Sequence, residues 1–173
     1  MFATIYLPNF CLQAATRHQP ELNPVALIEE QERKPVIIQL NEVAENAGIR
    51  KGMTPSQALA RSLQVVIKVR APTQEKSIQE ILLHYAFTLS PFVEDTAPGV
   101  CTVQFTNCRN LSEKVGHVIE QLAECGIRAQ AAVAPTSDSS FLAAHLARPV
   151  LQIENAKEFL APLPIETLAM AAT

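Results

Sequence analysis

The order of periodicities along the chain constrains the fold more than any other feature of the sequence. Apolar residues recur at helical spacing over residues 73–89, and a second amphipathic stripe runs over residues 111–125. Between them, VEDTAPGVCTVQF at residues 93–105 is rich in strand-favouring residues and predicts a strand pair or one bent strand. Apolar strands are expected at residues 4–7 and 129–133. Together these segments predict an α+β fold with the ferredoxin-like order β-α-β-β-α-β.

The segment 9–72 predicts a small second lobe inserted after the first strand. Asn9 and Asn41 are placed to cap helices, the first over residues 10–18, and Thr54-Pro55-Ser56-Gln57 reads as a capping box with proline at the first helical position. The other elements that we expect are strands at 25–28, 35–40, 65–69 and 150–153, and helices at 42–47, 55–62, 139–147, 155–160 and 165–170.

Composition narrows the function classes. The 173 residues are 48% hydrophobic and carry a net charge of −3, whereas a free-standing nucleic-acid binder normally has a basic excess. The N-terminus has no signal-peptide pattern, and no apolar run approaches the length of about 18 residues that crosses a membrane. The four cysteines form no CxxC pair, which favours buried residues or free thiols in a reducing compartment over a zinc site. These cysteines are Cys11, Cys101, Cys108 and Cys125. We therefore expect a cytoplasmic protein.

Four local patterns, taken in order and at their spacing, carry a resemblance that covers nearly the whole chain. They are IYLPNFCLQAATRHQPEL near the N-terminus, AGIRKGMTPSQA at 47–58, SPFVEDTAPGVCTVQF at 90–105, and VAPTSDSSFLAAHLARPV with FLAPLPIETL towards the end. In these patterns the chain resembles the Y-family (translesion) DNA polymerases. The resemblance implies a palm at 1–8 and 73–165, a fingers-like lobe at 9–72, and the start of a missing thumb at 166–173. The chain would then be a fingers-plus-palm portion of such a protein.

The resemblance also identifies positions where this chain departs from the family. It places Tyr6 where the family has its first metal-binding Asp, and Gly99 and Val100 where the family has an Asp-Glu pair. Glu42 and Glu45 stand at the places of a Tyr and an Arg that contact the triphosphate. Because Mg²⁺ requires hard oxygen ligands, these degenerate positions imply no catalytic residues, no bound metal and no cofactor.

Other residues near these positions have less specific interpretations. His145 is nearest to the place of the family's triphosphate lysine. Glu94 and Asp95 are candidates for relocated metal ligands, but Glu94 also fits an ordinary strand position and Asp95 the start of a turn. Tyr6 is expected to pack into the space of the absent metal site.

This pattern of loss is similar to that of the catalytically inactive, ImuB-type homologues of the bacterial mutasome. The similarity implies a non-catalytic adaptor or scaffold in DNA damage tolerance and SOS mutagenesis. Its implied partners are an error-prone replicative-type DNA polymerase, a sliding clamp and a RecA-like protein, with weak DNA binding in this portion. Two alternatives remain: a functionless or structural fragment of a truncated polymerase-like gene, and an enzyme with a remodelled cleft.

Overall fold

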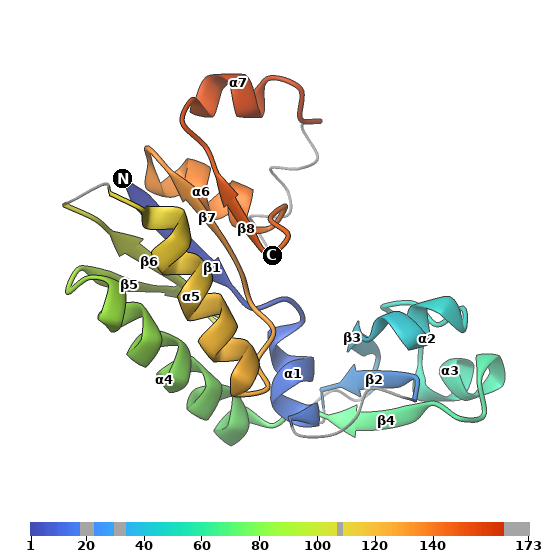
Figure 1. Cartoon of the computed structure of the whole chain (residues 1–173). Helices are drawn as coiled ribbons and strands as arrows, with labels where there is room; N and C mark the ends of the chain where they lie inside the picture. Colours follow the sequence, from blue (N-terminus) through green and yellow to red (C-terminus); the bar gives the residue numbers. More distant parts are fainter. Residues whose placement is uncertain (18–22, 30–33, 107–108, 165–173) are drawn as a thin grey trace. The chain divides into compact units, whose positions relative to one another are not determined.

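The computed structural model describes residues 1–17, 23–29, 34–106 and 109–164. The chain divides into two compact units (Figure 1). The first comprises Met1–Pro8 and Gln79–Thr173, and the second comprises Asn9–Ile78. The predicted helix at 165–170 and Cys108 lie outside the described residues.

The first unit contains a five-stranded sheet in the order β5-β6-β1-β7-β8. Its strands are β1 (Phe2–Tyr6), β5 (Val93–Ala97), β6 (Val100–Gln104), β7 (Gln130–Ala134) and β8 (Val150–Gln152), and its helices are α4 (Pro72–Leu89, continuing from the second unit), α5 (Leu111–Glu124), α6 (Ser137–Ala144) and α7 (Ala156–Leu160). The succession β1, α4, β5, β6, α5, β7 confirms the predicted α+β class and its ferredoxin-like order. Strand β8 extends this sheet by pairing in parallel with β7.

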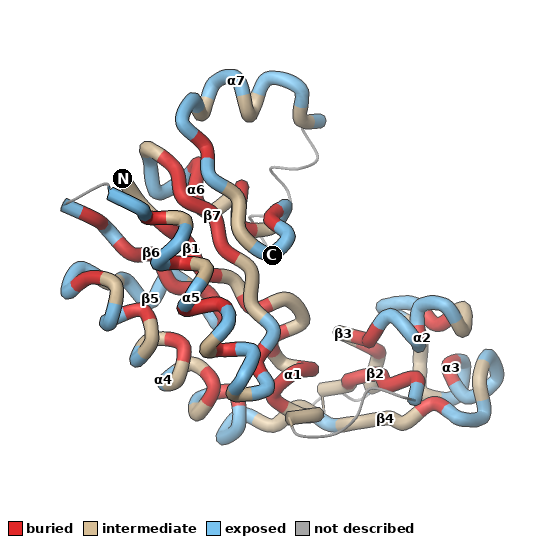
Figure 2. The backbone as a smooth tube through the Cα atoms, in the orientation of Figure 1, coloured by how far each residue is buried: buried red, intermediate tan, exposed pale blue. Residues whose placement is uncertain are grey.

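The core of the first unit follows from the alternation of β1. Ala3, Ile5 and Leu7 are completely buried on one face of the sheet, and Ile5 lies opposite Cys101 of β6 and Ala131 of β7. Helices α4 and α5 cover one face and α6 covers the other (Figure 1). The tube coloured by burial shows the buried residues concentrated along the central strands and on the inner sides of these helices (Figure 2).

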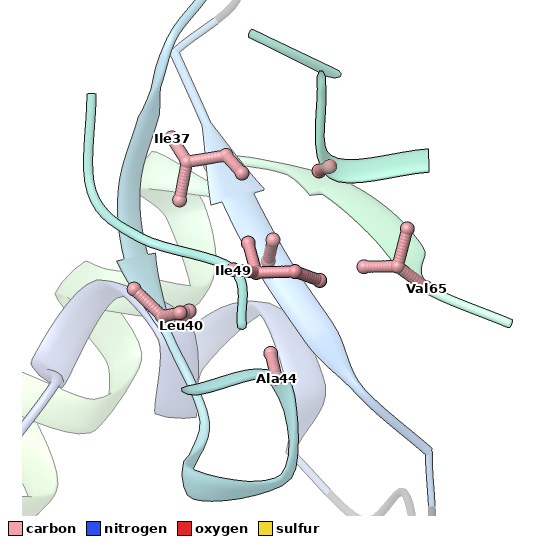
Figure 3. Close-up of a cluster of buried hydrophobic side chains, with 7 residues drawn as sticks. Ile37, Leu40, Ala44, Ile49 and Val65 are labelled. Carbon is pink, nitrogen blue, oxygen red and sulfur yellow. The ribbon is translucent and has the colours of Figure 1, made fainter. Parts of the chain in front are cut away.

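The second unit contains a three-stranded sheet in the order β3-β2-β4. Its elements are α1 (Phe10–Thr16), β2 (Val25–Ile28), β3 (Ile37–Leu40), α2 (Glu42–Asn46), α3 (Pro55–Arg61) and β4 (Val66–Val69). Its apolar cluster gathers side chains from the strands, from α2 and from the loops, and Figure 3 labels Ile37, Leu40, Ala44, Ile49 and Val65. This small lobe therefore has a core of its own.

Polar groups fix the ends of the elements in the second unit. The Asn41 side chain accepts the backbone N–H groups of Ala44 and Val25 and donates to the carbonyl of Asn23, so one amide joins the start of α2 to the start of β2. Thr54 and Gln57 form the predicted capping box of α3. Arg70 makes a two-pronged ion pair with the buried Glu75, at 2.8 and 2.9 Å, and this hydrogen bonding raises the pKa of Arg70.

One predicted helix cap and one predicted helix start differ from the structure, whereas α1 begins at Phe10 as predicted. Asn9 has a left-handed backbone (φ 49°) and makes no side-chain cap; its Nδ2 instead donates to the carbonyl of Leu40. Helix α6 begins at Ser137 rather than Ser139, because Thr136 is the capping residue and Ser139 is the third helical residue of the capping box. In the part of the chain that the structure describes, no helix is long and apolar enough to cross a membrane.

Candidate functional site

The structure brings together the three degenerate positions of the first unit. Tyr6 ends β1 and lies directly opposite Val100, the first residue of β6. Gly99 precedes Val100 in the turn of the β5–β6 hairpin, and its carbonyl accepts the backbone N–H of Leu7 at 2.8 Å. Positions far apart in the sequence thus meet at one end of the sheet, where the end of β1 faces the start of β6.

The hairpin at this site is held by a glutamine that the sequence analysis did not single out. The Gly99 N–H donates to Gln79 Oε1 at 2.7 Å, and Gln79 Nε2 donates to Asp95 Oδ1 at 2.6 Å. Gly99 has a φ of 75°, in the left-handed region that favours glycine. Asp95 lies within β5 and does not begin a turn; the turn comes at Pro98 and Gly99, where the glycine permits the reversal. The conformation of the hairpin turn therefore depends on the glycine at position 99.

Aromatic rings fill the space beside Tyr6. Its ring stacks on His145, with 4.1 Å between ring centroids and 28° between planes, and the Phe141 ring lies tilted against the imidazole at 4.9 Å. The imidazole Nδ1 is 2.8 Å from the carbonyl oxygen of Phe141, one turn earlier in α6. Burial raises the pKa of the half-buried Tyr6, so its phenol stays neutral. His145 is thus occupied in seating α6 against β1.

A row of hydroxyl groups crosses the same face of the sheet. Thr96 donates to Thr102 at 2.8 Å, Thr102 is joined to Thr4 at 3.3 Å, and Thr4 is joined to Ser140 at 2.8 Å. Ser140 in turn donates to the carbonyl of Ser137. Because each hydroxyl has one proton and can also accept, this chain runs in a single direction from Thr96 to Ser137. Neutral groups therefore satisfy one another where the face is buried.

The carboxylates nearest to this site do not converge. Glu94 and Asp95 are both exposed, and as successive residues of β5 they point to opposite faces of the sheet. Cys101, beside them on β6, is buried, and this burial raises its pKa to about 12. Within residues 1–17, 23–29, 34–106 and 109–164, no group of three or more His, Cys, Asp or Glu side chains is placed to hold a metal ion.

The side chains at these three positions do not fit the Mg²⁺ ions whose carboxylate ligands the family carries there. A phenol, a hydrogen atom and an isopropyl group are the side chains at Tyr6, Gly99 and Val100, and none is a carboxylate. Mg²⁺ sites in proteins are built on carboxylate oxygens held in near-octahedral geometry.

The two degenerate triphosphate positions lie in the second unit. Glu42 and Glu45 are both exposed and stand in the first turn of α2. The Arg50 guanidinium donates to the backbone carbonyls of Glu45 and Ile49, so it braces the loop after α2. The described surface of this short helix thus presents carboxylates, which repel a phosphate.

The family assignment rests on the sequence match. The model of the impB/mucB/samB family matches residues 5–145. The chain belongs to the impB/mucB/samB family. This assignment confirms the family-level resemblance, and the matched range includes all five degenerate positions.

Solved structures show the fold that this member of the impB/mucB/samB family shares. A post-insertion binary complex of Dbh DNA polymerase has a TM-score of 0.84 at 16% identity, over 96% of this chain and 52% of that chain. DinB from Sulfolobus solfataricus has a TM-score of 0.80 at 14% identity, over 96% of this chain and 53% of that chain. The predicted polymerase-like fold is thereby confirmed, and the chain spans about half the length of these proteins. No curated protein matches it significantly.

Proposed function

We propose that this chain is a non-catalytic, ImuB-type member of its family that acts as an adaptor or scaffold in DNA damage tolerance. One observation carries the proposal: Tyr6, Gly99 and Val100 lie side by side and offer no carboxylate. Two metal ions clamp the attacking and leaving oxygens in nucleotidyl transfer, and they depend on such ligands. Without them the fold keeps its shape and lacks the groups that drive the chemistry.

The surroundings of the three positions support the same conclusion. The Tyr6 ring stacks on His145. The hydroxyl groups from Thr96 to Ser140 form hydrogen bonds with one another, so these side chains already have partners within the protein. An enzyme with a remodelled cleft would need a convergent set of acid, base or nucleophile. Glu94 and Asp95, the carboxylates available for that purpose, diverge to opposite faces of the sheet.

The proposed partners come from the resemblance. They are an error-prone replicative-type DNA polymerase, a sliding clamp and a RecA-like protein, acting with this chain in the cytoplasm. The net charge of −3 supports weak DNA binding by this portion. In this role the chain contributes by holding partners together.

A primer-extension assay tests the loss of chemistry. The protein is incubated with a primed template, the four deoxynucleotides and Mg²⁺ or Mn²⁺, beside an E94Q/D95N variant purified in the same way. We expect no extension above that of a mock preparation. Template-dependent extension by the native chain that the double variant lacks would contradict the proposal and favour the remodelled enzyme.

A binding assay tests the adaptor role. Pull-down with the three proposed partners from the same organism is expected to retain at least one of them, while duplex DNA binds no more tightly than the non-specific range of about 10⁻⁴–10⁻⁶ M. If all three partners fail to bind, the alternative of a functionless fragment is favoured.

A further inference from the structure

The outer edge of the five-stranded sheet has the features of a peptide-docking site. Strand β5 stands at the end of the strand order, with β6 as its one neighbour among the described strands. Two large apolar side chains flank this edge strand: Phe87 near the end of α4 and Phe92 just before β5 are each 56% exposed. An exposed edge flanked by aromatic side chains is a template for another strand.

The sheet face opposite α4 and α5 forms one side of this site, since α6 on that face packs mainly on β1 and β7. Phe92 and Glu94 are two residues apart and so lie on the same face of the sheet. Both line a pocket of about 350 Å³, together with Phe2, Thr102 and Gln104. The Glu94 carboxylate is exposed beside these aromatic rings. The surface suits a side chain with an apolar stem and a cationic end, such as lysine or arginine.

The face covered by α4 and α5 forms the other side. Gln79, Leu83 and Phe87 are spaced four residues apart on α4 and so form one stripe. Gln79 contacts Asp95 of β5, which places the stripe along the edge strand, and three residues join the end of α4 to β5. Asp95 already accepts the hydrogen bond from Gln79. Leu83 and Phe87 therefore present an apolar surface on this side of β5.

The backbone of β5 supplies the hydrogen-bonding edge. The Phe92 carbonyl accepts the N–H of Gln104, so Phe92 directs its carbonyl towards β6. In an antiparallel ladder, the N–H and C=O groups of alternate residues point to opposite edges of the strand. Those of Val93 and Asp95 therefore point away from β6, towards the free edge. A strand laid against β5 would bond to these two residues.

We propose that the β5 edge docks an extended segment of a partner protein in which apolar residues alternate with lysine or arginine. The apolar side chains lie on Leu83 and Phe87, and the basic ones pass over Phe92 to Glu94. A second copy of this chain is a poor occupant, because antiparallel pairing of two β5 strands sets the carboxylates of one against those of the other. The inference does not depend on whether the chain has lost polymerase activity.

A fluorescence-polarisation titration tests this proposal with a short labelled peptide of alternating valine and lysine. The same titration is run with a valine–glutamate peptide and with a peptide of valine and lysine in two separate blocks. We expect the alternating valine–lysine peptide to bind, and the other two to bind at least about tenfold more weakly, a difference of about 1.4 kcal/mol.

Variants of the chain separate strand addition from non-specific attraction. V93P removes an outward N–H and leaves the ladder with β6 intact, since proline is tolerated on an edge strand whose N–H faces solvent. It is expected to weaken binding about tenfold, while V93T, which keeps the N–H, stays within about twofold. F87S and F92S each weaken binding several-fold, and L63S, at the 90% exposed Leu63 of the second unit, changes nothing.

Thermal unfolding of each variant establishes that it is folded. Equal binding by native chain and V93P, equal binding of the alternating and block peptides, or no binding of the alternating peptide overturns the proposal. Self-association in sedimentation that V93P abolishes also overturns it, because the edge then belongs to a second copy. If V93P does not fold, F87S and F92S against L63S decide the question.

Discussion

The two faces of β1 are built from different chemistry. On the side covered by α4 and α5, Ala3, Ile5 and Leu7 are completely buried among apolar neighbours. On the other side, Thr4 and Tyr6 are also covered, but by a hydroxyl row and a stacked ring. The first face is the general packing of an α+β domain. The second is where the resemblance places catalysis, and there the chain has neutral groups that satisfy one another.

The comparison teaches that a buried face can be closed without charge. Carboxylates gathered on one face repel each other unless cations or donors compensate them. Hydroxyls and a phenol need no such compensation, because their hydrogen bonds are completed within the protein. We therefore expect the apolar face to contribute more to the free energy of unfolding, for each side chain, than the polar face does.

The largest effect is expected on the apolar face. Replacing Ile5 by alanine removes a completely buried side chain from the centre of the sheet and leaves a cavity, which costs about 2–5 kcal/mol of unfolding free energy. Urea unfolding measures the change. A loss below about 1 kcal/mol would show that the core around β1 repacks, and the contrast between the faces would fail.

A smaller effect is expected at the turn of the β5–β6 hairpin, next to the polar face. Replacing Gln79 by leucine keeps the size of the side chain but leaves the buried Gly99 N–H without its acceptor, at a cost of about 1–3 kcal/mol. The exposed Gln74, also on α4, is the matched control, and Q74L should change stability by less than about 0.5 kcal/mol. Equal effects of the two variants would mean that Gln79 does not anchor the hairpin.

The smallest effect is expected within the hydroxyl row. Replacing Thr4 by valine removes the acceptor of Thr102 and the donor to Ser140, but Ser140 still donates to Ser137, so we expect a loss of about 0.5–1.5 kcal/mol. A double-mutant cycle with S140A isolates the bond of 2.8 Å between Thr4 and Ser140. Strict additivity would show that the two hydroxyls are not coupled.

The sequence predicted the elements better than it predicted the site. Long stripes over 73–89 and 111–125 identified α4 and α5, because helical periodicity over that length has few alternatives. The order of the elements then limited the sheet to one common arrangement. The start of α6 was missed because Thr136 and Ser139 are both good capping residues, and only the folded backbone selects between them.

The contacts of the site required the strand register. Tyr6, Gly99 and Val100 were identified by resemblance, whereas the hydroxyl row depends on Thr4 lying opposite Thr102, which the sequence does not specify. Gln79 was missed for the same reason: its place in the helix is visible, but the hairpin turn that it meets comes from tertiary structure. Both kinds of contact join residues that are distant along the chain.

The ring stack of Tyr6 on His145 also gives the protein an internal optical probe. The chain has two tyrosines and no tryptophan, and the second tyrosine is Tyr85 on α4. Exchanging Tyr85 for phenylalanine therefore leaves Tyr6 as the sole tyrosine emitter. Its fluorescence then follows the seating of α6 on β1 in solution, without a dye and without touching the strand that carries it.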